Sequence, residues 1–204
     1  MRSFDSHAET TTSRGPAEPV SDPDAALVSA AGNGDMSAAA ELLTRHADKI
    51  YALGYRMLGN AEAAEDLTQD VFFKIWKNAT DWQPGRARFS TWLYRVAINL
   101  CYDRLRKRRE SSVEDLPEVM RDQASDETAE YVLERQLTRD RVQEAIASLP
   151  ERQAAAIMLC HFHGYTNKEA AQIMDTSDEA VESLLARGRR KLKELLKDER
   201  IGGK

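Results

Sequence analysis

An acidic segment near the middle of the chain limits the possible folds more than any other feature. Between residues 111 and 134 the only basic residue is Arg121, and Pro117 interrupts a stretch with few large apolar side chains. Such a segment has too little to bury to form a packed core. Its acidic residues are Glu114, Asp115, Glu118, Asp122, Asp126, Glu127, Glu130 and Glu134. We therefore expect a flexible acidic linker over residues 111–136, with a separate domain on each side.

Both flanking segments, residues 23–110 and 137–198, carry apolar residues at helical spacing. We predict an all-α fold of two small helical domains. Residues 1–22 are rich in Ser, Thr, Pro, Ala and acidic residues, which predicts a disordered tail, and residues 199–204 form a second tail. The most clearly patterned helices are expected over residues 36–58, 61–79, 89–109, 167–174 and 177–197.

The charge of the chain is unevenly distributed. The net charge is -5, yet residues 104–109 and 187–193 are basic. The two cysteines, Cys101 and Cys160, form no CxxC motif, which is typical of a reducing compartment. No apolar run approaches the roughly 20 residues that span a bilayer, and the N-terminus lacks the apolar core of a signal peptide. We expect a cytoplasmic protein without membrane insertion.

The expected helix over residues 89–109 combines aromatic rings with a cluster of arginines. Ser90 or Thr91 can cap its start. One face is apolar through Trp92, Leu93, Val96, Ala97 and Leu100, and the other shows Arg95, Asn99, Tyr102, Asp103 and Arg106. Rings beside cations suit unpaired nucleic-acid bases, which stack while the backbone is neutralised. The alternative is a core helix with a solvated basic end, because cations also suit a helix C-terminus.

An acidic ridge runs along the preceding helix. Glu62, Asp66 and Asp70 follow one another at four-residue intervals and share one face. A straight ridge spreads its carboxylates instead of converging them, and no His accompanies them, so we expect no metal site there. The ridge is either a solvated face or a docking surface for a basic partner, with Phe73 as its apolar anchor.

The end of the chain has the pattern of a helix-turn-helix. A short expected helix, the turn Asp175-Thr176-Ser177 and a longer helix with basic residues follow in that order. Basic residues neutralise phosphates and supply most of the non-specific affinity for DNA. Two helices of an ordinary bundle would give the same pattern.

Three metal-capable side chains, Cys160, His161 and His163, lie close together in the sequence. Helical spacing points them in different directions, and no second cluster completes a four-ligand set. The chain also lacks a nucleophile motif, a P-loop and a dinucleotide fingerprint. We expect no bound metal, no cofactor and no catalytic residues.

Four motifs in this order resemble the bacterial RNA polymerase sigma factors of the sigma-70 family, extracytoplasmic-function (ECF) group. They are AEDLTQDVFFKIW, FSTWLYRVAINLCYDRLRKRR, LPERQAAAIMLCHFHGYTNKEAAQIM and SDEAVESLLARGRRKLK, within residues 25–197. The resemblance implies a region 2 domain, which binds core polymerase and the -10 element, and a region 4 domain, which binds the -35 element. It implies a factor that directs promoter recognition, -10 melting and transcription initiation in a stress or envelope response.

The resemblance also assigns residues to three surfaces. For polymerase binding we expect Asp66, Gln69 and Asp70, with Phe73 beside them. For the -10 element we expect Arg86, Arg88, Phe89, Asn99, Tyr102, Asp103 and Arg106. For the -35 element we expect Ser177, Glu179, Glu182, Ser183, Arg187 and Arg190. Trp92 and Leu93 match buried positions of the family.

Two departures from the family pattern affect these expectations. Asp175 stands where the family's turn usually has Gly, and Asp adopts the left-handed conformation less readily. The recognition helix begins with acidic residues, which repel phosphate, although one of them could accept a hydrogen bond from cytosine N4. The family's base preference is therefore not carried over to this chain.

The expected partners are core RNA polymerase, promoter DNA and an anti-sigma factor. One rival interpretation is a free-standing helix-turn-helix transcriptional regulator, which leaves the acidic ridge and the aromatic-basic helix unexplained. The other rival is a metal-dependent nuclease or phosphoesterase that uses Glu62, Glu65, Asp66 and Asp70.

Overall fold

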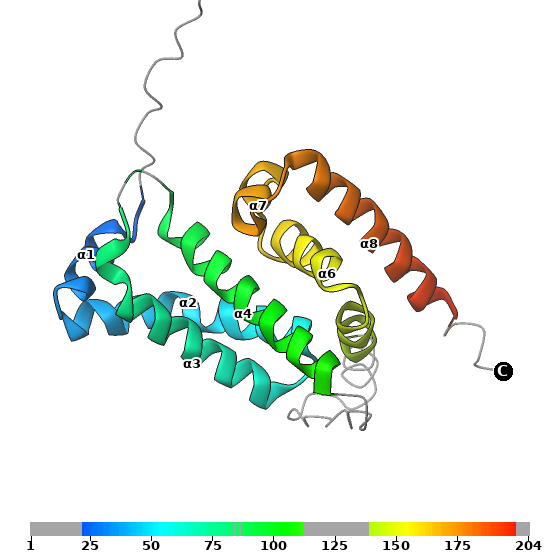
Figure 1. Ribbon diagram of the computed structural model, residues 1–204, viewed down its shortest axis with the longest axis horizontal. Helices are drawn as coiled ribbons and strands as arrows, with labels where there is room; N and C mark the ends of the chain where they lie inside the picture. Colours follow the sequence, from blue (N-terminus) through cyan, green and yellow to red (C-terminus); the bar gives the residue numbers. More distant parts are fainter. Residues whose placement is uncertain (1–21, 84, 86, 112–138, 199–204) are drawn as a thin grey trace, which may run out of the picture.

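A computed structural model describes residues 22–83, 85, 87–111 and 139–198, and every regular element in these ranges is a helix (Figure 1). The all-α prediction is therefore confirmed for the described part of the chain. The expected N-terminal tail up to residue 21, the acidic linker from residue 112 to 136 and the C-terminal tail from residue 199 lie outside the described residues.

The N-terminal unit is built from three long helices and a short one. α2, α3 and α4 lie side by side, and α1 covers one end of them (Figure 1). The elements are α1 (Ala25–Gly32), α2 (Met36–Leu58), α3 (Ala61–Lys77), a single 3-10 turn (Ala79–Asp81) and α4 (Phe89–Ser111).

Local signals set most of the helix ends in this unit. The Asp35 carboxylate accepts hydrogen bonds from two backbone N–H groups at the start of α2. Gly59 ends α2 in the left-handed conformation with a φ of 72°, and the Asn60 side chain then caps α3. The core between the helices includes Leu42, Ile50, Leu53, Leu67, Val71, Ile75, Leu93 and Ile98.

The C-terminal unit stacks four helical segments. The first segment is a helix whose described residues are 139–147. It is followed by α6 (Glu151–Ile157), which continues as a π-helical turn (Met158–Phe162), then α7 (Asn167–Met174) and α8 (Asp178–Asp198). A reciprocal capping box between Thr166 and Glu169 starts α7. Asp175 ends α7 with a φ of 50°, so the expected turn forms without glycine.

The two units pack directly against each other, which the sequence does not predict. α4 of the first unit contacts α7 of the second, and the helix over residues 139–147 rests on the end of α2 (Figure 1). The Gln143 side chain donates to the Tyr55 carbonyl oxygen at 2.6 Å there. α4 is covered on one side by α2 and α3 and on another by α7.

Gly54 of α2 lies in close contact with α3. A Cβ atom at this position would lie 2.6 Å from Leu67 Cδ2 and 3.3 Å from the Ala64 backbone. We expect Gly54→Val to lower the free energy of unfolding of the N-terminal unit by about 1–3 kcal/mol through overpacking. Urea unfolding followed by tryptophan fluorescence measures the loss.

Ala40→Val is the matched control, because Ala40 lies exposed on the same helix. This control should change the free energy of unfolding by less than about 1 kcal/mol. Equal losses in the two variants would show that a β-branched side chain anywhere on α2 causes the loss, and not the contact of α2 with α3 at Gly54.

Candidate functional site

The acidic face of α3 is exposed as expected. Asp66, Gln69 and Asp70 all lie at the surface, and the Phe73 side chain beside them is 69% exposed. Asp70 is partly neutralised, because its carboxylate accepts a hydrogen bond from Arg104 of α4 at 2.6 Å. An exposed apolar ring beside carboxylates suits a basic protein partner with an apolar pocket.

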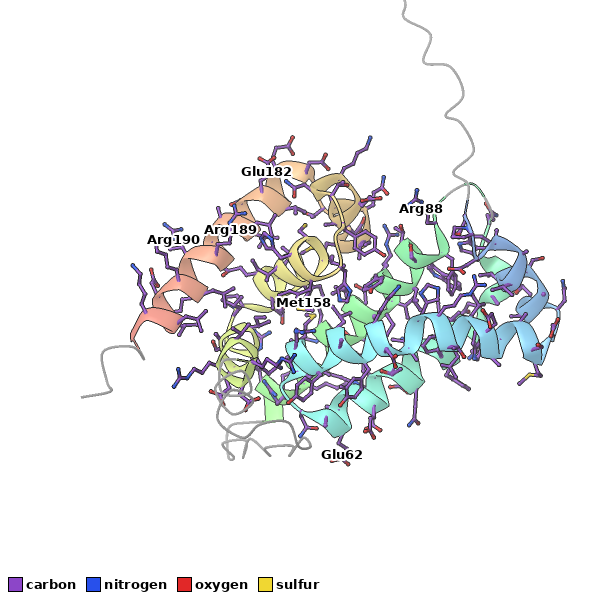
Figure 2. The ribbon with its side chains drawn as sticks, turned by 180° about the vertical axis from the view of Figure 1, so that it is seen from behind. Glu62, Arg88, Met158, Glu182, Arg189 and Arg190 are labelled. Atoms are coloured by element: carbon purple, nitrogen blue, oxygen red, sulfur yellow. The ribbon has the colours of Figure 1, made fainter. Side chains whose placement is uncertain are left out.

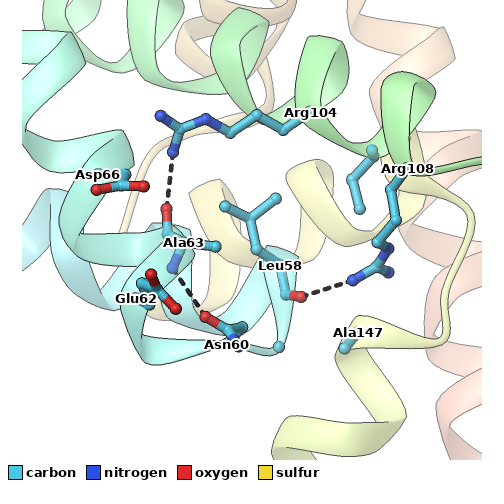
Figure 3. Close-up of a pocket in the computed structure, with 10 residues that line it drawn as sticks. Leu58, Asn60, Glu62, Ala63, Asp66, Arg104, Arg108 and Ala147 are labelled. Carbon is cyan, nitrogen blue, oxygen red and sulfur yellow. Dashed lines mark hydrogen bonds between the residues drawn. The ribbon is translucent and has the colours of Figure 1, made fainter. Parts of the chain in front are cut away.

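Two arginines of α4 serve the packing of the helices rather than an open basic surface. Arg104 donates to the Ala63 carbonyl oxygen at 2.7 Å, and Arg108 donates to the Leu58 carbonyl oxygen at 3.0 Å (Figure 3). Both line a cavity of about 580 Å³ between the α2–α3 turn, α4 and the helix over residues 139–147. Much of the basic cluster at the end of α4 is therefore engaged within the protein.

Phe89 corrects the expected set of -10 residues. Its ring is 0% exposed, so the expectation that it contacts DNA is wrong. The ring packs edge-on against His46, Trp82 and Trp92, with centroid separations of 5.5, 6.4 and 6.0 Å. The expectation came from the resemblance to the family. In this structure Phe89 begins α4 and its ring points into the aromatic cluster formed by these three rings.

The other expected -10 residues differ in exposure. Arg88, Asn99 and Arg106 are exposed, and Tyr102 and Asp103 are half-buried, whereas Arg86 lies outside the described residues. Arg106 donates to the Asp103 carboxylate at 2.9 Å on the same face. Burial raises the pKa of Tyr102, whose hydroxyl has no hydrogen-bond partner among the described residues. This face combines an amide, a ring and a guanidinium.

A groove beside the start of α4 was missed by the sequence interpretation. It has a volume of about 670 Å³, and the residues that line it include Lys74, Trp82, Thr91, Trp92, Arg95 and Gln172. The indole Nε1 of Trp82 is buried there without an acceptor among the described residues. Two indole rings with lysine and arginine can stack a base and hold its phosphate. In the sequence, Trp82 and Trp92 were the signal from which this groove could have been predicted.

The C-terminal unit faces both of these surfaces. Asn99, Tyr102 and Arg106 line a cleft of about 640 Å³ whose opposite wall contains Glu151 and Asp175. Arg95 donates to the Gln172 carbonyl oxygen of α7, and Arg109 pairs with the Glu151 carboxylate. We call this packing of the two units against each other the closed arrangement. In it, polar groups of the C-terminal unit lie next to the groups of α4 that could bind DNA.

An aromatic contact holds the closed arrangement together. The Tyr94 hydroxyl and His163 Nδ1 share a hydrogen bond of 2.8 Å, and the Tyr165 ring packs edge-on against Tyr94. Burial, together with the cations Arg56 and Lys49, lowers the pKa of His163 to about 4, so its imidazole is neutral near pH 7. Arg56 also lies 4.6 Å from the centroid of the Phe162 ring.

α8 and the residue before it expose the side chains that are expected to bind duplex DNA. All six expected residues, Ser177, Glu179, Glu182, Ser183, Arg187 and Arg190, are exposed, and Glu182 and Arg190 project outward in Figure 2. Val181, Leu184 and Leu185 form the opposite, buried face. Hydrogen bonds from its own backbone N–H and from Ser177 lower the pKa of Glu179, which keeps this carboxylate ionised. The exposed face has acidic residues at its start and arginines further along.

Two of the metal-capable side chains have polar contacts of their own. The Cys160 thiol lies 3.8 Å from Asn167 Oδ1, and His163 is engaged by Tyr94. No group of three or more potential metal ligands converges within the described residues. None of the described helices combines the length and apolarity needed to cross a membrane.

Comparisons with known proteins identify the family of the chain. The family model for Sigma-70 region 2 matches residues 42–111, and the model for Sigma-70 region 4 matches residues 139–192. The ECF RNA polymerase sigma factor SigE of Mycolicibacterium smegmatis is 34% identical over 194 residues, which cover 93% of this chain and 74% of that protein. SigW of Bacillus subtilis is 33% identical over 176 residues, which cover 81% and 92%.

Two solved structures share the fold. CnrH in complex with the cytosolic domain of CnrY matches with a TM-score of 0.65 at 24% identity, covering 86% of this chain and 97% of that one. RpoE of Bartonella quintana, in complex with the anti-sigma factor NepR, matches with a TM-score of 0.63 at 24% identity, covering 77% and 95%. Because both family models match in order and two relatives above 30% identity are covered over most of their length, the chain belongs to the ECF group of sigma-70 RNA polymerase sigma factors, which direct promoter recognition.

Proposed function

We propose that this sigma factor uses three separate surfaces in initiation. The acidic face of α3, with Asp66, Gln69, Asp70 and Phe73, docks on core RNA polymerase. The exposed face of α4 and the groove with Trp82 and Trp92 capture melted bases of the -10 element. The exposed face of α8 binds duplex at the -35 element. The observation that carries this assignment is that all three surfaces are exposed or hollowed while the opposite sides of their helices are buried.

The energetics of promoter opening are consistent with these roles of the three surfaces. Unstacking a base step costs a few kcal/mol, and stacking on an aromatic side chain returns about 1–3 kcal/mol per base. Capture by α4 alone is therefore weak. Attaching both DNA-binding units to one polymerase makes the second contact intramolecular and raises the overall affinity. The protein contributes binding and positioning, with no chemistry of its own, and acts in the cytoplasm.

The closed arrangement is incompatible with simultaneous use of these surfaces. Asn99, Tyr102 and Arg106 face the C-terminal unit, and Arg95 is engaged by α7. We propose that the two units separate on the polymerase. RpoE of Bartonella quintana was solved with an anti-sigma factor bound, and we extend a partner of this kind to this chain.

The α4 assignment predicts a selective defect. Asn99→Ala and Arg106→Ala should each reduce open-complex formation by roughly 5- to 100-fold, corresponding to about 1–3 kcal/mol. Polymerase affinity should stay within about twofold, because α3 is unchanged. Run-off transcription and permanganate reactivity of the -10 region measure opening, and Arg139→Ala, an exposed change on another helix, is the control.

Equal loss of polymerase binding in these variants would refute the placement of -10 capture on α4. Failure of the unaltered protein to bind core polymerase would favour a free-standing regulator.

The proposed role of α8 predicts how the affinity for -35 duplex depends on salt concentration. Arg187→Ala and Arg190→Ala should each weaken binding of the holoenzyme to -35 duplex, and each should reduce the slope of log affinity against log salt by about one. Lys197→Ala, exposed in the last turn of the same helix, should change the slope less. An unchanged slope in both arginine variants would place the duplex elsewhere.

The Tyr94–His163 contact predicts how the free chain opens. Tyr94→Phe and His163→Ala should increase the radius of gyration in small-angle scattering and tighten binding of a single-stranded -10 oligonucleotide. Tyr55→Phe, whose ring stacks within α2, is the control. The same radius in all variants would contradict a role for this contact.

The same interface should respond to pH. The folded pKa of His163, about 4, lies below its ordinary value of 6.5, so the neutral form stabilises the closed arrangement. This contribution is fully present above pH 6.5 and is lost as the pH falls towards 4. His163→Ala should remove this part of the pH dependence.

A further inference from the structure

The start of α4 is held by a residue far away in the sequence. The first backbone N–H groups of a helix have no acceptor within the helix. Neither Ser90 nor Thr91 caps α4, because the helix already begins at Phe89. Instead, the Phe89 N–H donates to Oδ2 of Asp22, 67 residues earlier. A carboxylate at this position also interacts favourably with the helix dipole.

The same carboxylate ties α4 to the start of α1. Its second oxygen, Oδ1, accepts a hydrogen bond from the Asp24 N–H at 2.9 Å, and the Asp22 carbonyl oxygen accepts one from the Ala25 N–H at 3.2 Å. One side chain therefore sets the distance between two helix starts.

Asp24 fixes this turn to α2. Its carboxylate is nearly buried, at 6% exposure, and accepts hydrogen bonds of 2.8 Å from both Arg45 and His46 of α2. A buried carboxylate is stable only when it is paired in this way. The His46 ring then packs edge-on against Phe89, which closes the connection.

This network ends at the groove proposed for base capture. Phe89 packs between Trp82 and Trp92, and both indole rings line the groove. Arg88 directly precedes Phe89 in the chain. Binding groups must be held to about 0.5 Å by their supporting residues to act effectively. A shift of the Phe89 backbone would move the groove and Arg88 together.

We propose that Asp22 is a positioning residue for capture of the -10 bases, although it lies outside the residues 42–111 that the region 2 model matches. It touches no DNA itself. It holds the first turn of α4 against α1, and so fixes Phe89, Trp82 and Trp92 in the geometry that admits a base. This inference rests on the proposed role of α4.

Asp35 provides a matched control for the test. Its carboxylate caps α2 by accepting from the Ser37 and Ala38 N–H groups. Asp35→Ala therefore removes a helix cap of the same kind from the same unit, but at a helix start that does not line the groove. Asp22→Asn keeps one acceptor oxygen and tests rescue.

The experiment uses full-length variants assembled with core polymerase. Opening is followed by permanganate reactivity, base capture by binding of a -10 oligonucleotide to the holoenzyme, and docking by polymerase affinity. Asp22→Ala should reduce opening and oligonucleotide binding about threefold to tenfold, the factor expected for losing one cap. Polymerase affinity should stay within about twofold, and Asp35→Ala should leave both DNA readouts within about twofold. Asp22→Asn should recover only part of the loss, because its single carbonyl oxygen can replace one of the two acceptors that the carboxylate offers to the Phe89 and Asp24 N–H groups.

Two outcomes would overturn the proposal. One is equal loss of opening in Asp22→Ala and Asp35→Ala, which would indicate general destabilisation. The other is normal opening in Asp22→Ala while Asn99→Ala and Arg106→Ala are defective, in which case the proposed function stands and only the role of Asp22 fails. If opening is unaffected in all of these variants, α4 is not the -10 reader and the proposed function itself fails.

Discussion

The burial of α4 on two sides is the constraint on which the rest of the structure depends. Leu93 and Ala97 pack into the core shared with α2 and α3, whereas Tyr94 packs against His163 and Tyr165 of the second unit. A helix with one apolar stripe needs only one covered face. α4 has a second apolar strip, and the closed arrangement covers it. The residues of α4 that we propose to bind DNA lie on the narrow polar surface that remains.

This double burial explains why so many arginines of α4 are engaged within the protein. Arg104 and Arg108 bind carbonyl oxygens of the N-terminal unit, and Arg95 and Arg109 bind acceptors of the C-terminal unit. The first pair holds the unit together in any state of the molecule. The second pair joins the two units, so the separation that we propose on the polymerase would free these cations for phosphate. Under that proposal, one helix is both a structural core element and a conditional DNA-binding surface.

Much of the fold was predictable because its signals are local. The bounds of α2, the cap at Asn60, the cap at Thr166 and the left-handed turn at Asp175 all follow from residues within a few positions of one another. The candidate surfaces on α3 and α8 were predictable for a related reason. Helical periodicity alone decides which residues of an amphipathic helix are exposed once the opposite face is buried. Asp70 and Arg190 are examples, and both are exposed in the structure.

The sequence by itself determined the helices, their ends and the outward faces of α3 and α8, because these depend on contacts within one or two turns. Only the tertiary structure decided the role of Phe89, the cap that Asp22 supplies to α4 and the contact of Tyr94 with His163. The Asp22 cap and the Tyr94–His163 contact join residues 67 and 69 positions apart, and the burial of Phe89 depends in part on the distant His46. No periodicity encodes such a pairing, since it arises when separate helices pack and place a side chain beside an unsatisfied backbone group or an apolar strip.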